Sequence, residues 1–198
     1  MSSGREDVDV RCLGNGRPFV LEIPNSAKVS LDEKSAINME CNVNKSGKVS
    51  IRDLQLVKRE ELYHIKSGEE DKKKIYRALC IVQEDVGVEI LKSLNIEKGF
   101  EIQQWTPLRV LHRRSLIQRP RMVHSIVPHL IEGSKNQIAL DIITQAGTYI
   151  KELVHGEFGR TVPSISSIIG KEIDIVALDV MNIDLNFPPS LNRIHNID

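Results

Sequence analysis

The stretch IYRALCIV, residues 75–82, decides the class of fold that this chain adopts. It is short and apolar apart from Tyr76 and Arg77, which is typical of a buried strand. The segment that follows, residues 85–94, repeats apolar residues at the spacing of an amphipathic helix, at Val86, Ile90, Leu91 and Leu94. A strand followed at once by a helix indicates a domain that combines a sheet with helices.

Outward from this segment, the pattern predicts several more strands. They lie at residues 18–23, 49–57, 108–112, 122–127, 138–143 and 173–185. Helices are predicted after residues 30–33, whose spacing matches a capping box, and from about Thr148. Long strands with few crossover helices favour an α+β domain over a doubly wound parallel sheet. We therefore expect one domain over residues 1–198, built on a mostly antiparallel mixed sheet flanked by helices.

The composition is that of an ordinary globular domain. The 198 residues are 40% hydrophobic and 27% charged, and the formal net charge is zero. The three cysteines are far apart and form no C-x-x-C pair, which argues against a disulfide framework and a zinc site. No apolar run approaches the roughly 20 residues of a membrane span, and the first residues are too polar for a signal peptide. We expect no metal, no membrane contact, and residence in the nucleus, the cytoplasm or both.

One stretch departs from this balance of charge. Residues 102–131 contain no acidic residue, whereas five arginines lie close together, at Arg109, Arg113, Arg114, Arg119 and Arg121. Arginine forks suit bidentate contacts with phosphates, so a sheet face that carries them could follow an RNA backbone. The same charges could equally serve only to keep an exposed edge soluble. The stretch on its own leaves both interpretations open.

Three separate segments contain further candidates. The first is GREDVDVR at residues 4–11, the second is KIYRAL at 74–79, and the third is QAGTYIKE at 145–152. Taken singly, each has an ordinary structural explanation. An acid such as Asp7 in a polar loop is usually a turn residue, Tyr76 would fill a core, and Lys151 would be a solvated lysine.

Together and in this order, the three segments closely resemble the tRNA pseudouridine synthase 10 family of eukaryotes and archaea. The block TPLRVLHRR, residues 106–114, is similar to the basic motif of the same family. The resemblance runs from Gly4 to about Pro189, with a looser match over residues 24–71. It implies the pseudouridine synthase fold and an isomerase that converts uridine to pseudouridine in the TΨC arm of tRNA, at positions 54 and 55. It also implies a monomeric protein whose partner is tRNA and which uses no nucleotide or other cofactor.

The resemblance also assigns roles to individual residues. It implies that Asp7 is the catalytic carboxylate, that Tyr76 stacks on the target base and helps to remove its C5 proton, and that Lys151 pairs with the carboxylate. Arg5 is a second candidate for that pairing, and Asp9 is a bystander. The residues that it implies for substrate binding are Arg5, Tyr76, Arg109, Arg113, Arg114, Thr148 and Tyr149.

Two departures from the family pattern bear on activity. Trp105 stands where a lysine is expected, which removes a cation and supplies an aromatic surface for stacking. Family members also carry, ahead of the catalytic loop, a further strand and helix and an accessory RNA-binding domain that contains a THUMP module. We therefore expect a catalytic domain truncated on its N-terminal side, which binds tRNA but modifies it poorly when isolated. The alternative to an active enzyme is a truncated, catalytically weak RNA-binding module.

Overall fold

The centre of the sheet consists of two strands whose side chains alternate between the core and the opposite face. In the computed structural model, which describes residues 1–65 and 72–191, β2 spans Lys74–Val82 and β5 spans Gln137–Thr144. Every second residue of each strand is buried, as the side-chain period of a pleated strand requires. The strands pair antiparallel, with Ala78 opposite Leu140. This pairing confirms the strands predicted at residues 75–82 and 138–143.

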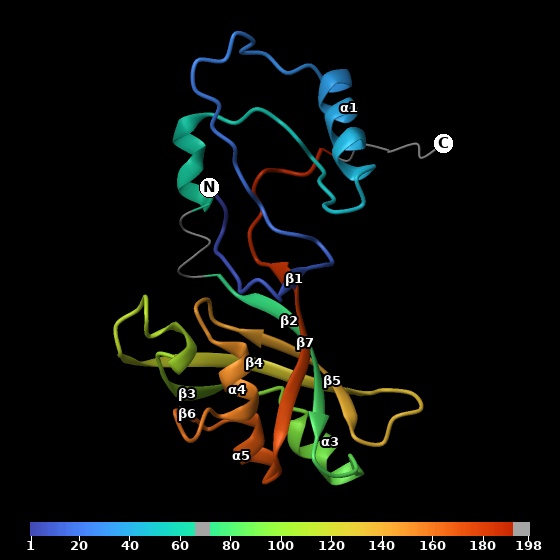
Figure 1. The fold of residues 1–198 in the computed structure, drawn as a ribbon, viewed down its shortest axis with the longest axis vertical. Helices are drawn as coiled ribbons and strands as arrows, with labels where there is room; N and C mark the ends of the chain where they lie inside the picture. Colours follow the sequence, from blue (N-terminus) through green and yellow to red (C-terminus); the bar gives the residue numbers. More distant parts are fainter. Residues whose placement is uncertain (66–71, 192–198) are drawn as a thin grey trace.

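Within the described part of the chain, further strands extend this centre to a seven-stranded sheet with the order β1-β7-β2-β5-β4-β3-β6 (Figure 1). The added strands are β1 Arg11–Cys12, β3 Phe100–Trp105, β4 Gln118–Leu130, β6 Thr161–Val162 and β7 Ile173–Ile183. The pair β1 and β7 is parallel, and the other neighbouring pairs are antiparallel. The expected α+β class with a mostly antiparallel mixed sheet is therefore confirmed.

Helices pack against one face of this sheet. α3 spans Val88–Leu94, α4 spans Ile150–His155 and α5 spans Ile165–Ile169, and α4 contacts both β7 and α5. Their apolar side chains join the buried face of the sheet in one core, which includes Ala78, Leu94, Leu140, Ile142, Leu153, Val154 and Ile165. The helices predicted at residues 85–94 and from about Thr148 are thus confirmed. Among the described residues, no helix has the length and apolar character needed to cross a membrane.

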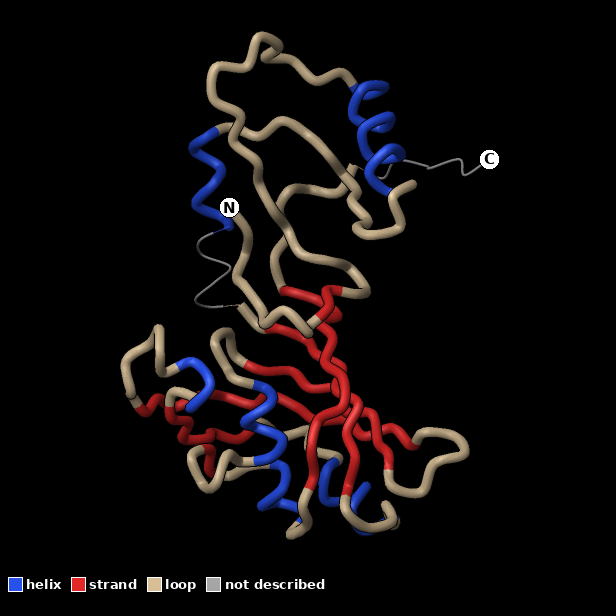
Figure 2. The backbone as a smooth tube through the Cα atoms, in the orientation of Figure 1, coloured by secondary structure: helices blue, strands red, loops and turns tan. Residues whose placement is uncertain are grey.

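A second, loop-rich region lies beyond the end of the sheet that carries β1 (Figure 2). It contains α1, Glu33–Asn44, and a short 3₁₀ helix, η1, Arg59–Leu62. Asp32 caps α1 by accepting a hydrogen bond from the Ser35 amide at 2.9 Å, which confirms the helix predicted after residues 30–33. The C-terminal segment returns to this region, where the Phe187 ring stacks on His64 with 5.4 Å between ring centroids.

Residues 49–57, predicted as a strand, form none in the structure. Side chains of α1 satisfy their backbone instead, because Asn44 bonds both the amide of Ile51, at 2.7 Å, and its carbonyl, at 3.0 Å. Glu40 accepts a hydrogen bond from the Leu54 amide at 2.5 Å. Asp53 also has a φ of 57°, which interrupts an extended run. Hydrogen bonds to side chains of α1 thus replace those that a neighbouring strand would have supplied.

Two further strand predictions are wrong. Residues 18–23 form only an isolated bridge from Phe19 to Ser2, in a stretch that begins with a proline and so lacks one amide donor. Residues 108–112 turn instead in a 3₁₀ helix, η2, Leu108–Val110, directly after Pro107. The Leu108 amide donates to the Glu157 carboxylate at 3.0 Å, a tertiary contact that holds this turn.

Candidate active site

The loop that carries Asp7 is tied to the sheet by the residue before it. The Glu6 carboxylate accepts hydrogen bonds from Arg17 at 2.6 Å and from Lys74 of β2 at 3.3 Å. Both cations are almost buried, so solvent screens these ion pairs little. Gly4 has a φ of 105°, which favours glycine, and a Cβ there would crowd Arg17 Nη1 at 3.0 Å. The backbone beside Asp7 is therefore held firmly.

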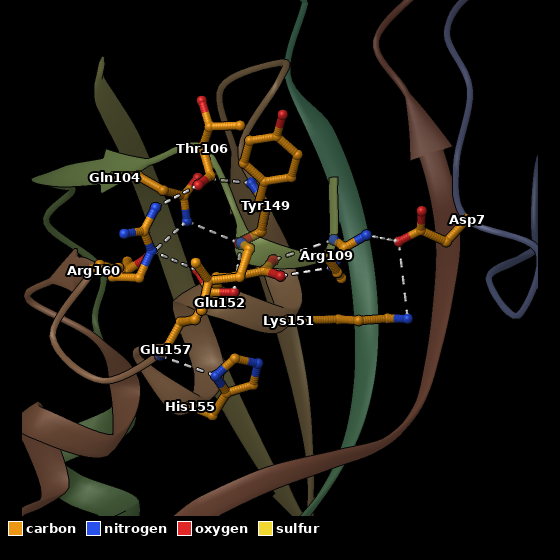
Figure 3. A network of polar contacts seen from close by, with 12 residues as sticks. Asp7, Gln104, Thr106, Arg109, Tyr149, Lys151, Glu152, His155, Glu157 and Arg160 are labelled. Carbon is orange, nitrogen blue, oxygen red and sulfur yellow. Dashed lines mark hydrogen bonds and ion pairs between the residues drawn. The ribbon is translucent and has the colours of Figure 1, made fainter. Parts of the chain in front are cut away.

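Asp7 ends a chain of three charged side chains (Figure 3). Arg109 Nη1 donates a short hydrogen bond to Asp7 Oδ2. The same guanidinium donates from Nε and Nη2 to the Glu152 carboxylate at 2.7 Å and 3.3 Å, and Glu152 is only 1% exposed. Burial lowers the pKa of Arg109, but its bonds to Glu152 and the charges of Glu152 and Asp7 outweigh this effect and raise the net pKa. Arg109 therefore remains cationic and holds Asp7 in one orientation.

Lys151 of α4 lies between two carboxylates and is nearer to Asp9 than to Asp7. Its Nζ is 2.7 Å from Asp9 Oδ2 and 3.9 Å from Asp7 Oδ2. The hydrogen bond from Lys151 lowers the pKa of Asp9. Arg113 approaches Asp7 from another side, with Nη2 3.7 Å from Oδ1. Of the cations in the described residues that contact Asp7, Arg109 is thus the nearest, although the sequence-based interpretation assigns Arg109 to the RNA.

Two adjoining cavities open beside these charges. One, of about 350 Å³, is lined by Asp7, Arg109, Arg113 and Lys151. The other, of about 340 Å³, is lined by Tyr76, Gln104, Arg119 and Arg121. Both cavities are also lined by Arg5, Glu6, Arg114, Thr148 and Tyr149. Every site residue expected from the sequence therefore lines one cavity or both, and the five arginines of the basic stretch gather around them.

A buried amide holds the residues that the two cavities share. Gln104 of β3 accepts a hydrogen bond from the Tyr149 amide at 2.8 Å and donates one to the Tyr149 carbonyl at 3.0 Å. The Thr148 hydroxyl donates to the Gln145 carbonyl at 2.8 Å. The Tyr149 ring stands between Gln104 and Arg109 (Figure 3), and the Arg109 Cζ is 5.9 Å from the centre of the ring. These contacts thus hold Thr148 and Tyr149, which line both cavities, in place.

Tyr76 belongs to the core as well as to its cavity. Its side chain is 2% exposed and points to the same face of β2 as Lys74 and Ala78. Burial, and after it the negative charge of Glu6, raises the pKa of the Tyr76 hydroxyl far above its ordinary value. The phenol therefore stays protonated at neutral pH.

We expect the Tyr76 phenol to ionise at a higher pH than an ordinary tyrosine. In an alkaline absorbance titration, one phenol should ionise only beyond the ordinary pKa of about 10. The raised pKa favours the folded state fully below pH ~10, and this contribution to the free energy of unfolding is lost as the pH rises above that value. Tyr76→Phe should remove the late phenol, and a late phenol that persists in this variant would contradict the assignment.

Three residues of the site have no role in the sequence-based interpretation, namely Glu6, Gln104 and Glu152. For two of them, the sequence pattern contains a polar residue at a position where a buried side chain is expected. Glu152 stands between the inward-facing Ile150 and Leu153, and Gln104 has the same strand parity as the buried Ile102, so each pattern indicates a buried polar partner. For Glu6 we find no such signal, because its partners lie in separate segments. Residues 1–65 and 72–191 contain no group of three or more His, Cys, Asp or Glu side chains that could hold a metal ion.

Comparisons with known proteins cover almost the whole chain. The family model described as "Pus10, C-terminal" matches residues 1–184. The chain is 63% identical over 193 residues to the "Putative tRNA pseudouridine synthase Pus10" of Drosophila melanogaster, covering 98% of this chain and 39% of that protein. It is 46% identical over 192 residues to the "tRNA pseudouridine synthase Pus10" of Homo sapiens, covering 96% of this chain and 36% of that protein. The chain thus spans less than half the length of these relatives.

Proposed function

This chain belongs to the Pus10 C-terminal family, and from that membership we propose that it isomerises uridine to pseudouridine in the TΨC arm of tRNA. One observation of the structure supports the proposal most directly. The Asp7 carboxylate is held by Arg109 in a cavity rich in cations, and this cavity adjoins a second one that contains Tyr76. A fixed acid, an aromatic face and surrounding cations are what a reaction on a base of an RNA strand requires.

The reaction exchanges one bond of the target nucleoside for another. The bond between ribose C1′ and uracil N1 breaks, the base rotates, and C1′ bonds to C5 while the C5 proton leaves and N1 gains a proton. Asp7 acts in the cleavage, and two routes fit its chemistry, attack on the ribose or abstraction of a ribose proton. Either route needs a carboxylate in a fixed position, which the hydrogen bond from Arg109 provides.

The target base must leave its stack before this chemistry can take place. We propose that the flipped base enters between Asp7 and Tyr76, through the region that the two cavities share. The face of Tyr76 stacks on the base, and Tyr149 borders the same space. Because burial keeps the Tyr76 hydroxyl protonated, we assign Tyr76 to stacking and hydrogen-bond donation rather than to accepting the C5 proton.

The proposal is tested by incubating the 198-residue chain with a tRNA transcript and mapping pseudouridine chemically along the RNA. We expect modification at the uridines of the TΨC arm. A matched transcript with cytidines at those positions should remain unmodified. Wild-type chain that binds the transcript but leaves every uridine unchanged, even at stoichiometric protein, would contradict the activity.

A second candidate function would then hold, that of an RNA-binding module without catalysis. The observation that favours it is the set of arginines that line both cavities, because phosphate contacts alone are sufficient to bind RNA. Binding measured together with modification separates the two functions, because the module predicts affinity for tRNA and no product.

A further inference from the structure

We infer that Arg114, Arg119 and Arg121 form a phosphate-binding subsite, which holds a phosphodiester of the RNA strand next to the target nucleotide. The inference rests on the proposed function and adds the residues that grip the substrate backbone. The sequence-based interpretation assigns that task to Arg109, Arg113 and Arg114. In the structure, Arg109 forms ion pairs with Asp7 and Glu152, so its charge is already balanced by carboxylates of the chain.

The pairing of β4 with β3 places two of these arginines on the face of the sheet that is turned toward the core. Arg119 lies opposite Gln104, and Arg121 lies opposite Ile102. Directly opposed residues of an antiparallel pair share a face, and residues two apart on one strand do so as well. Gln104 and Ile102 are both buried on the side that faces the core. Arg119 and Arg121 therefore project at the margin of that side, and both line the cavity that contains Tyr76.

Carboxylates of the described residues do not neutralise the charge of these arginines. Across residues 1–65 and 72–191, no carboxylate forms an ion pair with Arg114, Arg119 or Arg121. The acid that lines their cavity in this part of the chain is Glu6, and it is already bonded to Arg17 and Lys74. In the neighbouring cavity, by contrast, Arg109, Arg113 and Lys151 each pair with Asp7, Asp9 or Glu152. The described part of the chain thus supplies carboxylate partners to Arg109, Arg113 and Lys151 but not to Arg119 and Arg121.

The charged form of Arg121 is disfavoured by its surroundings in the protein. Burial, and after it the positive charge of Arg119, lowers the pKa of Arg121. Its Nε donates to the Gly147 carbonyl at 3.2 Å and its Nη1 to the Pro120 carbonyl at 3.1 Å, which leaves part of its five N–H donors available to a ligand. A Cβ at Gly147 would lie 3.3 Å from Nη2, so the glycine preserves room for the guanidinium. Two like charges held close together without an acid are typical of an anion site.

The position of the cluster identifies the anion. Arg114 lines both cavities, as do Thr148 and Tyr149. An RNA strand bound at Arg119 and Arg121 can therefore continue past these residues toward Asp7. Several separate cations suit successive charges along a chain better than one compact anion. A phosphodiester backbone carries such a series of charges, and arginine forks match its oxygens. Within the proposed reaction, the cluster would hold the backbone while the target base turns toward Asp7.

The test compares two double variants of the 198-residue chain with equal loss of charge. Arg119→Ala with Arg121→Ala removes the cluster, whereas Arg11→Ala with Arg77→Ala removes two exposed arginines that pair with Asp179 and Asp141 across the other face of the sheet. We expect the first variant to bind tRNA weaker by on the order of tenfold for each arginine. The slope of log affinity against log salt should also become shallower by about one to two. The second variant should keep both values near wild type.

Catalysis provides a second readout. At saturating tRNA the first variant should keep its single-turnover rate within a few-fold of wild type, because a contact that only grips the backbone changes KM more than kcat. Arg121→Lys should keep more of the salt slope than of the affinity, since an ammonium keeps the charge and loses the fork of the guanidinium.

An unchanged salt slope in the first variant, or an equal loss of affinity in the control, would overturn this inference and leave the proposed function standing. Wild-type chain that does not bind tRNA would overturn the proposed function and this inference with it.

Discussion

Replacing Asp7 with asparagine is expected to abolish pseudouridine formation, with a loss of single-turnover rate on the order of 10³-fold or more. The amide keeps the size of the side chain and can still accept a hydrogen bond from Arg109, so the loop should retain its position. It cannot act as a nucleophile or as a base, because it carries no negative charge. The affinity for tRNA should be unchanged or slightly higher, since an acid is removed from a cavity whose charged residues are mostly cations. Product is measured by chemical mapping, and affinity by filter binding.

Asp9→Asn is the matched control for this prediction. Asp9 lies two residues further along the same loop and binds Lys151 at 2.7 Å, yet it is not among the residues that line either cavity. Its loss frees Lys151 to move toward Asp7, which lies 3.9 Å away. We expect Asp9→Asn to retain activity within a few-fold. An equal loss in both variants would mean that the role of the reactive carboxylate has been assigned to the wrong acid.

Glu152→Gln should give the second largest effect, a fall in the single-turnover rate on the order of 10²-fold with little change in affinity. Glu152 is a positioning residue, because it reaches Asp7 only through the Arg109 guanidinium. A glutamine can accept one of the two hydrogen bonds but presents an NH₂ group to the other guanidinium nitrogen. Arg109 should then rotate away and carry Asp7 with it, and a displacement near 1 Å is sufficient for a loss of about this size.

Two comparisons separate this role from a general loss of stability. Asp141→Asn breaks a similar two-bond pair with Arg77 on the opposite face of the sheet and should leave the rate near wild type. In an Arg109→Ala background, Glu152→Gln should cause no further loss, since residues that act through one another are not additive. Independent, multiplying losses in the double variant would contradict a role for Glu152 through Arg109. Thermal unfolding of each variant confirms that the fold is retained.

The parts of the fold that follow from local pattern were predicted well. β2, β5, β7 and α4 have apolar residues at a regular period, and that period depends only on the geometry of a strand or a helix. The failures have tertiary causes. Residues 108–112 look like a strand, but the contact of the Leu108 amide with Glu157 holds them in a turn. β3 was missed because Gln103 and Gln104 interrupt its apolar pattern, and Gln104 is satisfied by Tyr149, which lies far along the chain.

The resemblance of four segments to one family identified the segments that meet at the site. These are GREDVDVR, KIYRAL, QAGTYIKE and the basic stretch, and in the structure all four line the two cavities. How the charges pair within them depends on tertiary packing. Asp7 and Arg109 are 102 positions apart, and Lys151 and Asp9 are 142 apart. An ion pair depends on a separation of a few ångströms, and packing sets that separation for residues so distant in the chain. For that reason Arg109 pairs with Asp7, while Arg119 and Arg121 have no carboxylate partner among the described residues.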